Sequence, residues 1–282
     1  MKMLINKDTG VIVQGVGEQG SFHLRLMKEY GTNIIAAVST SKTGKIEGVP
    51  LYASVKDAIK EHKADFSILF VPAQFAKKAA LEALGNNLNI VIITEGIPVL
   101  DTIEIMQMAK GKKLLVIGPN TSGIISPEQS KIGIMPSHIF RRGHIAVISR
   151  SGTLAYEIVN QLTANGKGQS IVIGIGGDPV IGMDFIQGLK LAENDPDTEA
   201  IVLIGEIGGN LEEKAAEYIK NHVSKKVVAY IAGRATPKDK KMGHAGAIIE
   251  GNTGTADSKI FALKQAGVKI ADLPSGIIKF LQ

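Results

Sequence analysis

Residues 10–22 read GVIVQGVGEQGSF, and this stretch decides the fold of the first half of the chain. An apolar run ending at Gln14 leads into Gly15, Gly17 and Gly20, and a segment with helical periodicity follows directly. The spacing G-x-G-x-x-G allows a tight turn and lets the backbone approach a pyrophosphate at a helix N-terminus. The same spacing also occurs in plain strand-to-helix turns. With a strand before it and a helix after it, the loop predicts a Rossmann-type site for a dinucleotide or for CoA.

Apolar runs rich in Val and Ile recur along the chain, and each is followed by a longer amphipathic stretch. The runs cover residues 10–14, 33–39, 66–72, 89–94 and 113–118, and then 144–149, 170–174, 200–205, 226–231 and 268–271. Such alternation is typical of β-α-β units and parallel sheets. We therefore predict an α/β fold of two successive doubly wound domains. The connection over residues 119–143 separates them, and we place the boundary between residues 125 and 126.

Composition narrows the class of protein. The chain has 282 residues, enough for two domains, and no cysteine, which excludes disulfides, thiolate metal sites and cysteine nucleophiles. A signal peptide and an apolar run near 18 residues are both absent, so we expect a cytoplasmic protein with no membrane partner. The net charge is +5, but the basic residues are dispersed and aromatic residues are few, so a small anionic substrate is favoured over nucleic acid. We expect no metal site in this chain.

The residue type that follows the second apolar run discriminates among nucleotide ligands. An NAD enzyme usually places Asp or Glu there for the ribose hydroxyls. This chain instead has three hydroxyl residues followed by Lys42. A lysine among hydroxyls suits a ribose phosphate, as in CoA or NADP, although Lys42 also fits an ordinary solvated loop. A dehydrogenase is therefore disfavoured.

Two other segments follow predicted strands and carry candidate ligand groups. Ile93, Thr94 and Glu95 leave the fourth run, where they either contact a nucleotide or pantetheine chain or form a turn with Thr94 as a helix cap. In the second domain, Ser151, Gly152 and Thr153 open a helix and form either an anion site suited to phosphate or an ordinary N-cap. Tyr156 lies one turn further on.

A carboxylate and a histidine complete the set of candidates. Glu206 follows an apolar run, where it either orients a histidine or caps the next helix. His244 lies between Gly243 and Gly246 in a long loop that also contains Lys238, Lys240 and Lys241. Because an imidazole is nucleophilic when its other nitrogen is held by a carboxylate, His244 is a candidate nucleophile, although most loop histidines have no such role.

Several segments together resemble the succinyl-CoA synthetase alpha-subunit family. They are Gly243 to Ile248, Ser149 to Leu154, Gly174 to Pro179, Gly205 to Gly209 and Ile93 to Pro98, they occur in the expected order, and the resemblance covers essentially the whole chain. It implies a CoA-binding Rossmann-like domain followed by a flavodoxin-like ligase domain. It also implies reversible formation of succinyl-CoA from succinate, CoA and a nucleoside triphosphate, through succinyl phosphate and a phosphohistidine.

The resemblance also implies roles for individual residues. His244 carries the phosphate and Glu206 orients it, while the helix start at Ser151 to Thr153 binds that phosphate, with Tyr156 near the substrate. CoA is held by residues of the first domain: Gly17, Glu18, Gln19, Lys42, Ile93, Thr94 and Glu95. ATP or GTP, with Mg²⁺, is bound by a beta subunit with an ATP-grasp fold, which this chain lacks.

The chain departs from the common bacterial form of the family at two places. The loop from Gly15 to Gly20 is one residue shorter, and Thr121 and Ser122 stand where that form has Cys and Pro. Two alternative functions stay open. One is the alpha-type subunit of another acid-CoA ligase, acting on malate or acetate, and the other is a non-catalytic CoA-binding Rossmann regulator.

Overall fold

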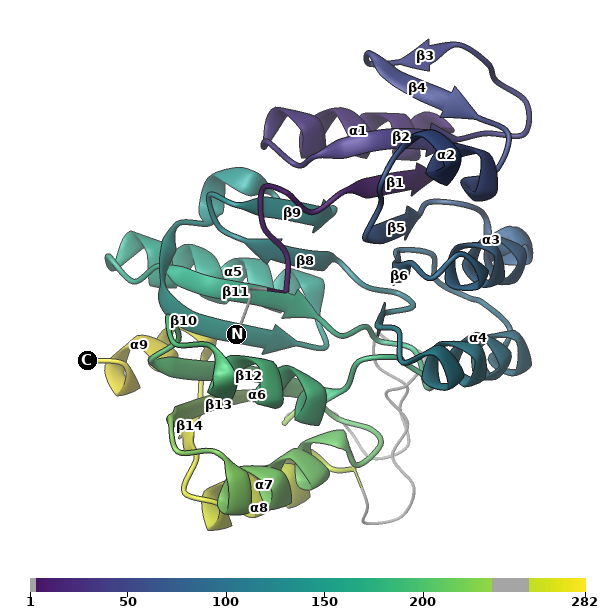
Figure 1. The fold of residues 1–282 in the computed structure, drawn as a ribbon. Coiled ribbons are helices and arrows are strands. Elements are labelled where there is room, and N and C mark those ends of the chain that lie inside the picture. Colours follow the sequence, from purple (N-terminus) through teal and green to yellow (C-terminus); the bar gives the residue numbers. More distant parts are fainter. Residues whose placement is uncertain (1–3, 235–253) are drawn as a thin grey trace. The chain divides into compact units, whose positions relative to one another are not determined.

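The computed structural model describes residues 4–234 and 254–282. These residues form two compact units, shown in Figure 1. The N-terminal unit comprises Ile5–Met135 with Val180–Gly182, and the C-terminal unit contains most of the remaining residues. None of the helices in the described ranges is both long enough and apolar enough to span a membrane.

The N-terminal unit is built on a mostly parallel sheet. Its strands are β1 (Val11–Gln14), β2 (Ile34–Val38), β3 (Lys45–Ile46), β4 (Val49–Tyr52), β5 (Phe66–Leu69), β6 (Asn89–Ile92) and β7 (Val116–Ile117). They lie in the order β3-β4-β2-β1-β5-β6-β7, and only the β3–β4 pair is antiparallel. Without the edge strand β3, the order in chain sequence is 3-2-1-4-5-6, which is the order of Rossmann folds. The predicted Rossmann-like domain is confirmed.

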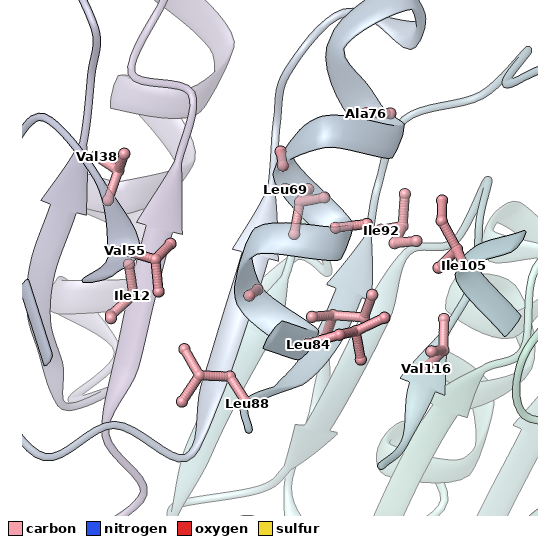
Figure 2. Close-up of a cluster of buried hydrophobic side chains, with 14 of the residues drawn as sticks. Ile12, Val38, Val55, Leu69, Ala76, Leu84, Leu88, Ile92, Ile105 and Val116 are labelled. Carbon is pink, nitrogen blue, oxygen red and sulfur yellow. The ribbon is translucent and has the colours of Figure 1, made fainter. Parts of the chain in front are cut away.

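Helices cover the N-terminal sheet. They are α1 (Glu18–Glu29), α2 (Val55–Glu61), α3 (Ala73–Gly85) and α4 (Val99–Lys112). Figure 2 shows the core between the sheet and α2, α3 and α4, where Ile12, Leu69 and Ile92 from the strands meet Leu84 and Ile105 from the helices. Alternate strand residues face opposite sides of a sheet, so the same strands supply a second apolar face.

The C-terminal unit has the second doubly wound sheet. Its strands are β10 (Arg142–Ser149), β11 (Gln169–Gly174), β12 (Ala200–Glu206), β13 (Lys226–Ala232) and β14 (Lys269–Ala271). Its helices are α5 (Gly152–Ala164), α6 (Phe185–Asn194), α7 (Leu211–His222), α8 (Ala256–Gln265) and α9 (Ile277–Phe280), with short 3₁₀ turns at Ser137–Ile139 and Pro274–Gly276. The strands lie in the order β14-β13-β12-β10-β11 and all pair in parallel. Counted along the chain this is 2-1-3-4-5, the flavodoxin-like order, as predicted.

The connection between the two series of strands is not the plain loop that the composition of residues 119–143 indicated. It contains an antiparallel hairpin of β8 (Gly123–Ser126) and β9 (Ser130–Gly133), and every residue of the two strands is buried. The hydroxyl of Thr32 donates to the carbonyl of Lys131 in this hairpin, at 2.7 Å. The hairpin clusters with the N-terminal unit, while its strands are the last two in the order of the second sheet, β14-β13-β12-β10-β11-β8-β9.

Topology selects one ligand position in each unit. In the N-terminal sheet β1 has parallel neighbours on both sides, β2 and β5, and in the C-terminal sheet β10 lies between β11 and β12. Ligands of such sheets bind beyond the carboxyl ends of the strands where the strand order reverses. The Gly15 to Gly20 loop follows β1, and Ser151 and Glu206 lie at the ends of β10 and β12, so the sequence candidates occupy both positions.

Lys131, in β9, is a buried cation outside these positions. Its ammonium donates to the carbonyl of Met135 at 3.2 Å and lies 5.6 Å from the centre of the Tyr30 ring. Burial lowers the pKa of Lys131 from 10.5 to about 8, while the charge of Glu29 opposes part of this shift. The folded chain therefore binds this proton more weakly than the unfolded chain does.

We predict a pH-dependent effect of K131M on stability. Because the pKa of Lys131 is lower in the folded state, the penalty for its charge is complete below pH 8 and falls as the pH rises toward 10.5. Any stability that K131M gains over the wild type should therefore shrink above pH 8, by at most about 1.4 kcal/mol per pH unit. Thermal unfolding of both proteins between pH 7 and 10 tests this, and a constant difference would contradict it.

Candidate functional site

The glycine loop of the N-terminal unit is shaped by two of its three glycines. Gly15 has a φ of 88°, and a Cβ placed on Gly20 would lie 1.8 Å from the carbonyl oxygen of Gly15. Both positions therefore require glycine for the strand-to-helix turn itself. A Cβ on Gly17, in contrast, would meet no protein atom within 4 Å. Contacts within the unit do not explain the third glycine, and the backbone at this point is open.

The first turn of helix α1 lies at the open backbone of Gly17. Gly17 is its N-cap residue, and no side chain caps the helix. The first N–H groups of a helix have no partner inside the helix, and they attract anions. Glu18 and Gln19 occupy the first turn and are exposed.

A cavity of about 430 Å³ opens beside this loop. It brings together two of the predicted residues, Gly17 and Lys42, with residues of β1, β2 and α3. The ammonium of Lys42 donates to the carbonyl of Val16 at 2.7 Å, and the backbone N–H of Lys42 donates to Ser39 Oγ at 3.1 Å. Lys42 is therefore tied to the glycine loop at the cavity, which favours the binding interpretation over that of a solvated loop lysine.

The other predicted residues of this unit lie outside the cavity lining. Glu18, Gln19 and the segment Ile93 to Glu95 do not line it. The Thr94 hydroxyl donates to the carbonyl of Val71 at 2.6 Å. The alternative of Thr94 as a helix cap is wrong, because α4 begins at Val99 with Pro98 as its N-cap residue.

Sequence reasoning missed the α3 side of the cavity. Phe75, Lys78 and Glu82 lie one helical turn apart on α3 and line it. The sequence does indicate these residues, because α3 follows β5, the strand next to β1 where the strand order reverses. Residues just after the third apolar run lie at the same edge of the sheet as the glycine loop.

In the C-terminal unit, the helix start after β10 is a polar turn. Ser151 caps α5 by accepting from the backbone N–H of Leu154 at 3.4 Å. The buried Ser149 hydroxyl donates to the carbonyl of Ser151 at 2.7 Å and accepts from its N–H at 3.1 Å. Gly152 is half-buried and Thr153 is exposed, so this turn reaches solvent. Ser151 is therefore the N-cap residue of α5, and the first N–H groups of this helix have the arrangement that binds anions.

Tyr156 lies further along α5 and is half-buried. It is on the same helix as the polar turn, one turn beyond Gly152. Among residues 4–234 and 254–282, no group of three or more His, Asp or Glu side chains is arranged to hold a metal ion.

Glu206 ends β12, next to the polar turn. Its side chain is 12% exposed, and its Oε1 lies 3.4 Å from Nη2 of Arg150. The alternative that Glu206 caps the next helix is wrong, because α7 begins at Leu211 with Asn210 as its N-cap residue. Since β10 and β12 are neighbours, the structure brings Glu206 and the start of α5 to one edge of the sheet.

His244 and the three lysines of its loop lie outside the described residues. The described chain stops at Arg234, which pairs with Asp272, and resumes at Gly254. The role of His244 therefore stays a prediction.

Comparison with known proteins agrees with this division of the chain. Residues 6–96 match a family described as CoA binding domain, and residues 148–269 match one described as CoA-ligase. A solved structure of ATP citrate lyase from Methanothrix soehngenii, in complex with citrate and coenzyme A, superposes with a TM-score of 0.91. It is 24% identical, and the match covers 99% of this chain and 50% of that chain. That likeness establishes the fold.

Curated relatives extend over nearly the whole chain. The succinate–CoA ligase [ADP-forming] subunit alpha of Methanothermobacter thermautotrophicus is 54% identical over 278 residues, which cover 98% of this chain and 94% of the relative. The corresponding subunit of Aquifex aeolicus is 51% identical, covering 98% and 92%. Two doubly wound units with these two matches define a CoA ligase chain. The chain belongs to the family of succinate–CoA ligase alpha subunits.

Proposed function

We propose that this chain, paired with a beta subunit, catalyses the reversible reaction of succinate, CoA and ATP to succinyl-CoA, ADP and phosphate. In the forward direction His244 accepts the γ-phosphoryl group of ATP and passes it to a carboxylate oxygen of succinate. The CoA thiol then attacks the carbonyl carbon of succinyl phosphate, and phosphate leaves. The observation that carries the proposal is the 54% identity, over 98% of the chain, to a succinate–CoA ligase [ADP-forming] subunit alpha.

The C-terminal unit would perform the phosphoryl step. His244 is the nucleophile, and Glu206 accepts a hydrogen bond from its second ring nitrogen and thereby raises its basicity. The N–H groups at Ser151 to Thr153 bind the phosphate, with Tyr156 near the substrate. The edge shared by β10 and β12 supports this assignment, because it places a carboxylate beside a helix start suited to an anion.

The N-terminal unit would hold CoA. The open backbone at Gly17 and the ammonium of Lys42, both at the cavity, suit the pyrophosphate and the ribose phosphate. We also assign Glu18, Gln19 and the segment Ile93 to Glu95 to this site. They lie after β1 and β6, on the sheet edge where ligands of this topology bind.

The nucleotide belongs to the partner in this proposal. A beta subunit with an ATP-grasp fold supplies the ATP site and its Mg²⁺, and the assembly works in the cytoplasm. Support for ADP as the product comes from the names of the relatives. We propose domain limits at residues 1–125 and 126–282, a boundary that falls inside the β8–β9 hairpin, between Ile125 and Ser126.

Purification of the chain with its native partner tests the proposal. We expect the complex to form a CoA thioester from succinate and ATP, and the isolated chain to form none. Malate, acetate and citrate, and GTP in place of ATP, are assayed in parallel. Thioester formation from another acid at a kcat/KM at least tenfold above that of succinate would overturn the substrate assignment, and CoA binding without any thioester would overturn the enzymatic one.

A further inference from the structure

Three charged side chains lie buried behind Glu206, and the reaction scheme above does not use them. They are Arg150, Glu212 and Lys259, with residue exposures of 5%, 2% and 0%. Arg150 follows β10, Glu212 is on α7 and Lys259 is on α8. We refer to these three residues as the buried ion cluster. Glu212 joins the two cations, since its Oε1 accepts from Nη1 of Arg150 at 3.2 Å and its Oε2 accepts from Nζ of Lys259.

The buried ion cluster contacts Glu206 from two sides. Arg150 places Nη2 3.4 Å from Oε1 of the Glu206 carboxylate. Glu212 accepts from the backbone N–H of Glu206 at 3.1 Å, through the same Oε1 that binds Arg150. The side-chain charge and the backbone of Glu206 are therefore both fixed by the cluster.

The cluster also holds the turn that follows Glu206. The carbonyl of Gly208 accepts from Nη1 of Arg150 at 2.9 Å and from Nζ of Lys259 at 3.0 Å. The N–H of Gly208 in turn donates to the carbonyl of Gly254 at 2.7 Å. On the other side of the turn, Gly233 lies so close to Ile207 that a Cβ there would be 2.7 Å from Cγ2 of Ile207.

Gly233 and Gly254 are near the two ends of the segment that contains His244 in the sequence. One turn, residues 206–209, therefore carries the carboxylate assigned to His244 and contacts the chain on both sides of that segment. A displacement of the turn would move the carboxylate and both contacts together.

Burial of three charges is a costly way to join two helices to a strand. Replacing a buried ion network by apolar residues of similar volume is often neutral or stabilising, so stability alone does not account for the cluster. The contacts of the cluster instead converge on one turn, because each of its three residues binds Glu206 or Gly208. We propose that Arg150, Glu212 and Lys259 are positioning residues that fix the Glu206 carboxylate and the 206–209 turn for phosphoryl transfer. This inference rests on the proposed function.

The test uses the complex with the beta subunit and single-turnover phosphorylation by ATP. K259M removes one cation but keeps the length of the side chain, and E212Q keeps the shape of its side chain. Without Lys259, Arg150 is the one cation of the cluster left to pair with Glu212. The Arg150 guanidinium should therefore shift toward Glu212 and away from the Glu206 carboxylate. We expect each variant to slow phosphorylation about 10- to 100-fold, the range found when a group that orients a metal ligand is lost. K259R should restore most of the rate.

Two controls separate positioning from general destabilisation. Gln169 is also fully buried in the C-terminal unit, and its side chain bonds to Thr163 and to the carbonyl of Lys167, away from Glu206. Q169L should lower the Tm yet leave the phosphorylation rate within twofold, on the order of the spread expected for a distant site. In the cluster variants the KM for CoA should stay unchanged, because the CoA site is assigned to the other unit.

A double-mutant cycle gives the decisive result. If Lys259 acts through Glu206, the double variant E206Q/K259M should be no slower than E206Q alone. If the rate loss of E206Q/K259M equals the product of the losses of the two single variants, the inference is overturned. Wild-type phosphorylation rates in both K259M and E212Q would overturn it as well. E212Q keeps the test valid if K259M does not fold. A wild-type complex that carries no acid-labile phosphate would instead overturn the proposed function itself.

Discussion

H244N is expected to abolish acid-labile phosphorylation of the chain in complex with its beta subunit. A phosphoryl group on an imidazole nitrogen forms a P–N bond that is stable in base and hydrolyses in acid, and an asparagine amide nitrogen is not nucleophilic. Loss of a covalent nucleophile typically costs at least about 10³-fold in turnover. Labelling of the complex with ATP carrying a radioactive γ-phosphate, followed by acid and base treatment, measures the effect directly.

The control for this prediction is a histidine of the same unit. His222 ends α7 and contacts the Tyr218 ring, and nothing in its position connects it with Glu206. H222N should therefore keep both the label and the turnover. Retention of the label in H244N would refute the assignment of the nucleophile, and loss of the label in H222N would move it to the other residue.

The fold could be predicted from the sequence because the apolar runs and the glycine turns that follow them agree with the tertiary structure. Every predicted apolar run overlaps a strand, and Gly15, which directly follows β1, has the positive φ that the turn requires. The hairpins were missed for a physical reason. Strand β3 has only two residues and is too short to show alternation. Strands β8 and β9 are buried at every residue, so no polar face marks them.

Only those residues of the candidate site that lie at strand ends could be predicted from the sequence. Ser151 follows β10 and Glu206 is the last residue of β12, so strand ends were sufficient to find them. Glu212 and Lys259 are 47 positions apart and meet only because α7 packs against α8. In sequence each looks like an ordinary charged residue of an amphipathic helix, and only burial reveals the cluster. Tertiary contact, which no local pattern encodes, is what makes these charges part of the site.

G20A is expected to lower stability and G17A to weaken CoA binding, although both add one methyl group to the same loop. At Gly20 the new Cβ would lie 1.8 Å from the carbonyl oxygen of Gly15, so α1 must move away from β1. Alanine is intrinsically favoured over glycine in a helix by about 1 kcal/mol, yet the clash should outweigh this and cost about 3 kcal/mol or more. Thermal unfolding should show a clearly lower Tm for G20A.

G17A should cost no more than about 1 kcal/mol, the difference between glycine and alanine at an N-cap, because the backbone at Gly17 has a φ of −67° and the Cβ meets no protein atom. If this open backbone is where the pyrophosphate of CoA lies, the same methyl group should weaken CoA binding about tenfold or more, which corresponds to about 1.4 kcal/mol. Calorimetric titration of the complex with CoA measures it. Wild-type affinity in a stable G17A would show that CoA does not approach the loop, whatever G20A does to the fold.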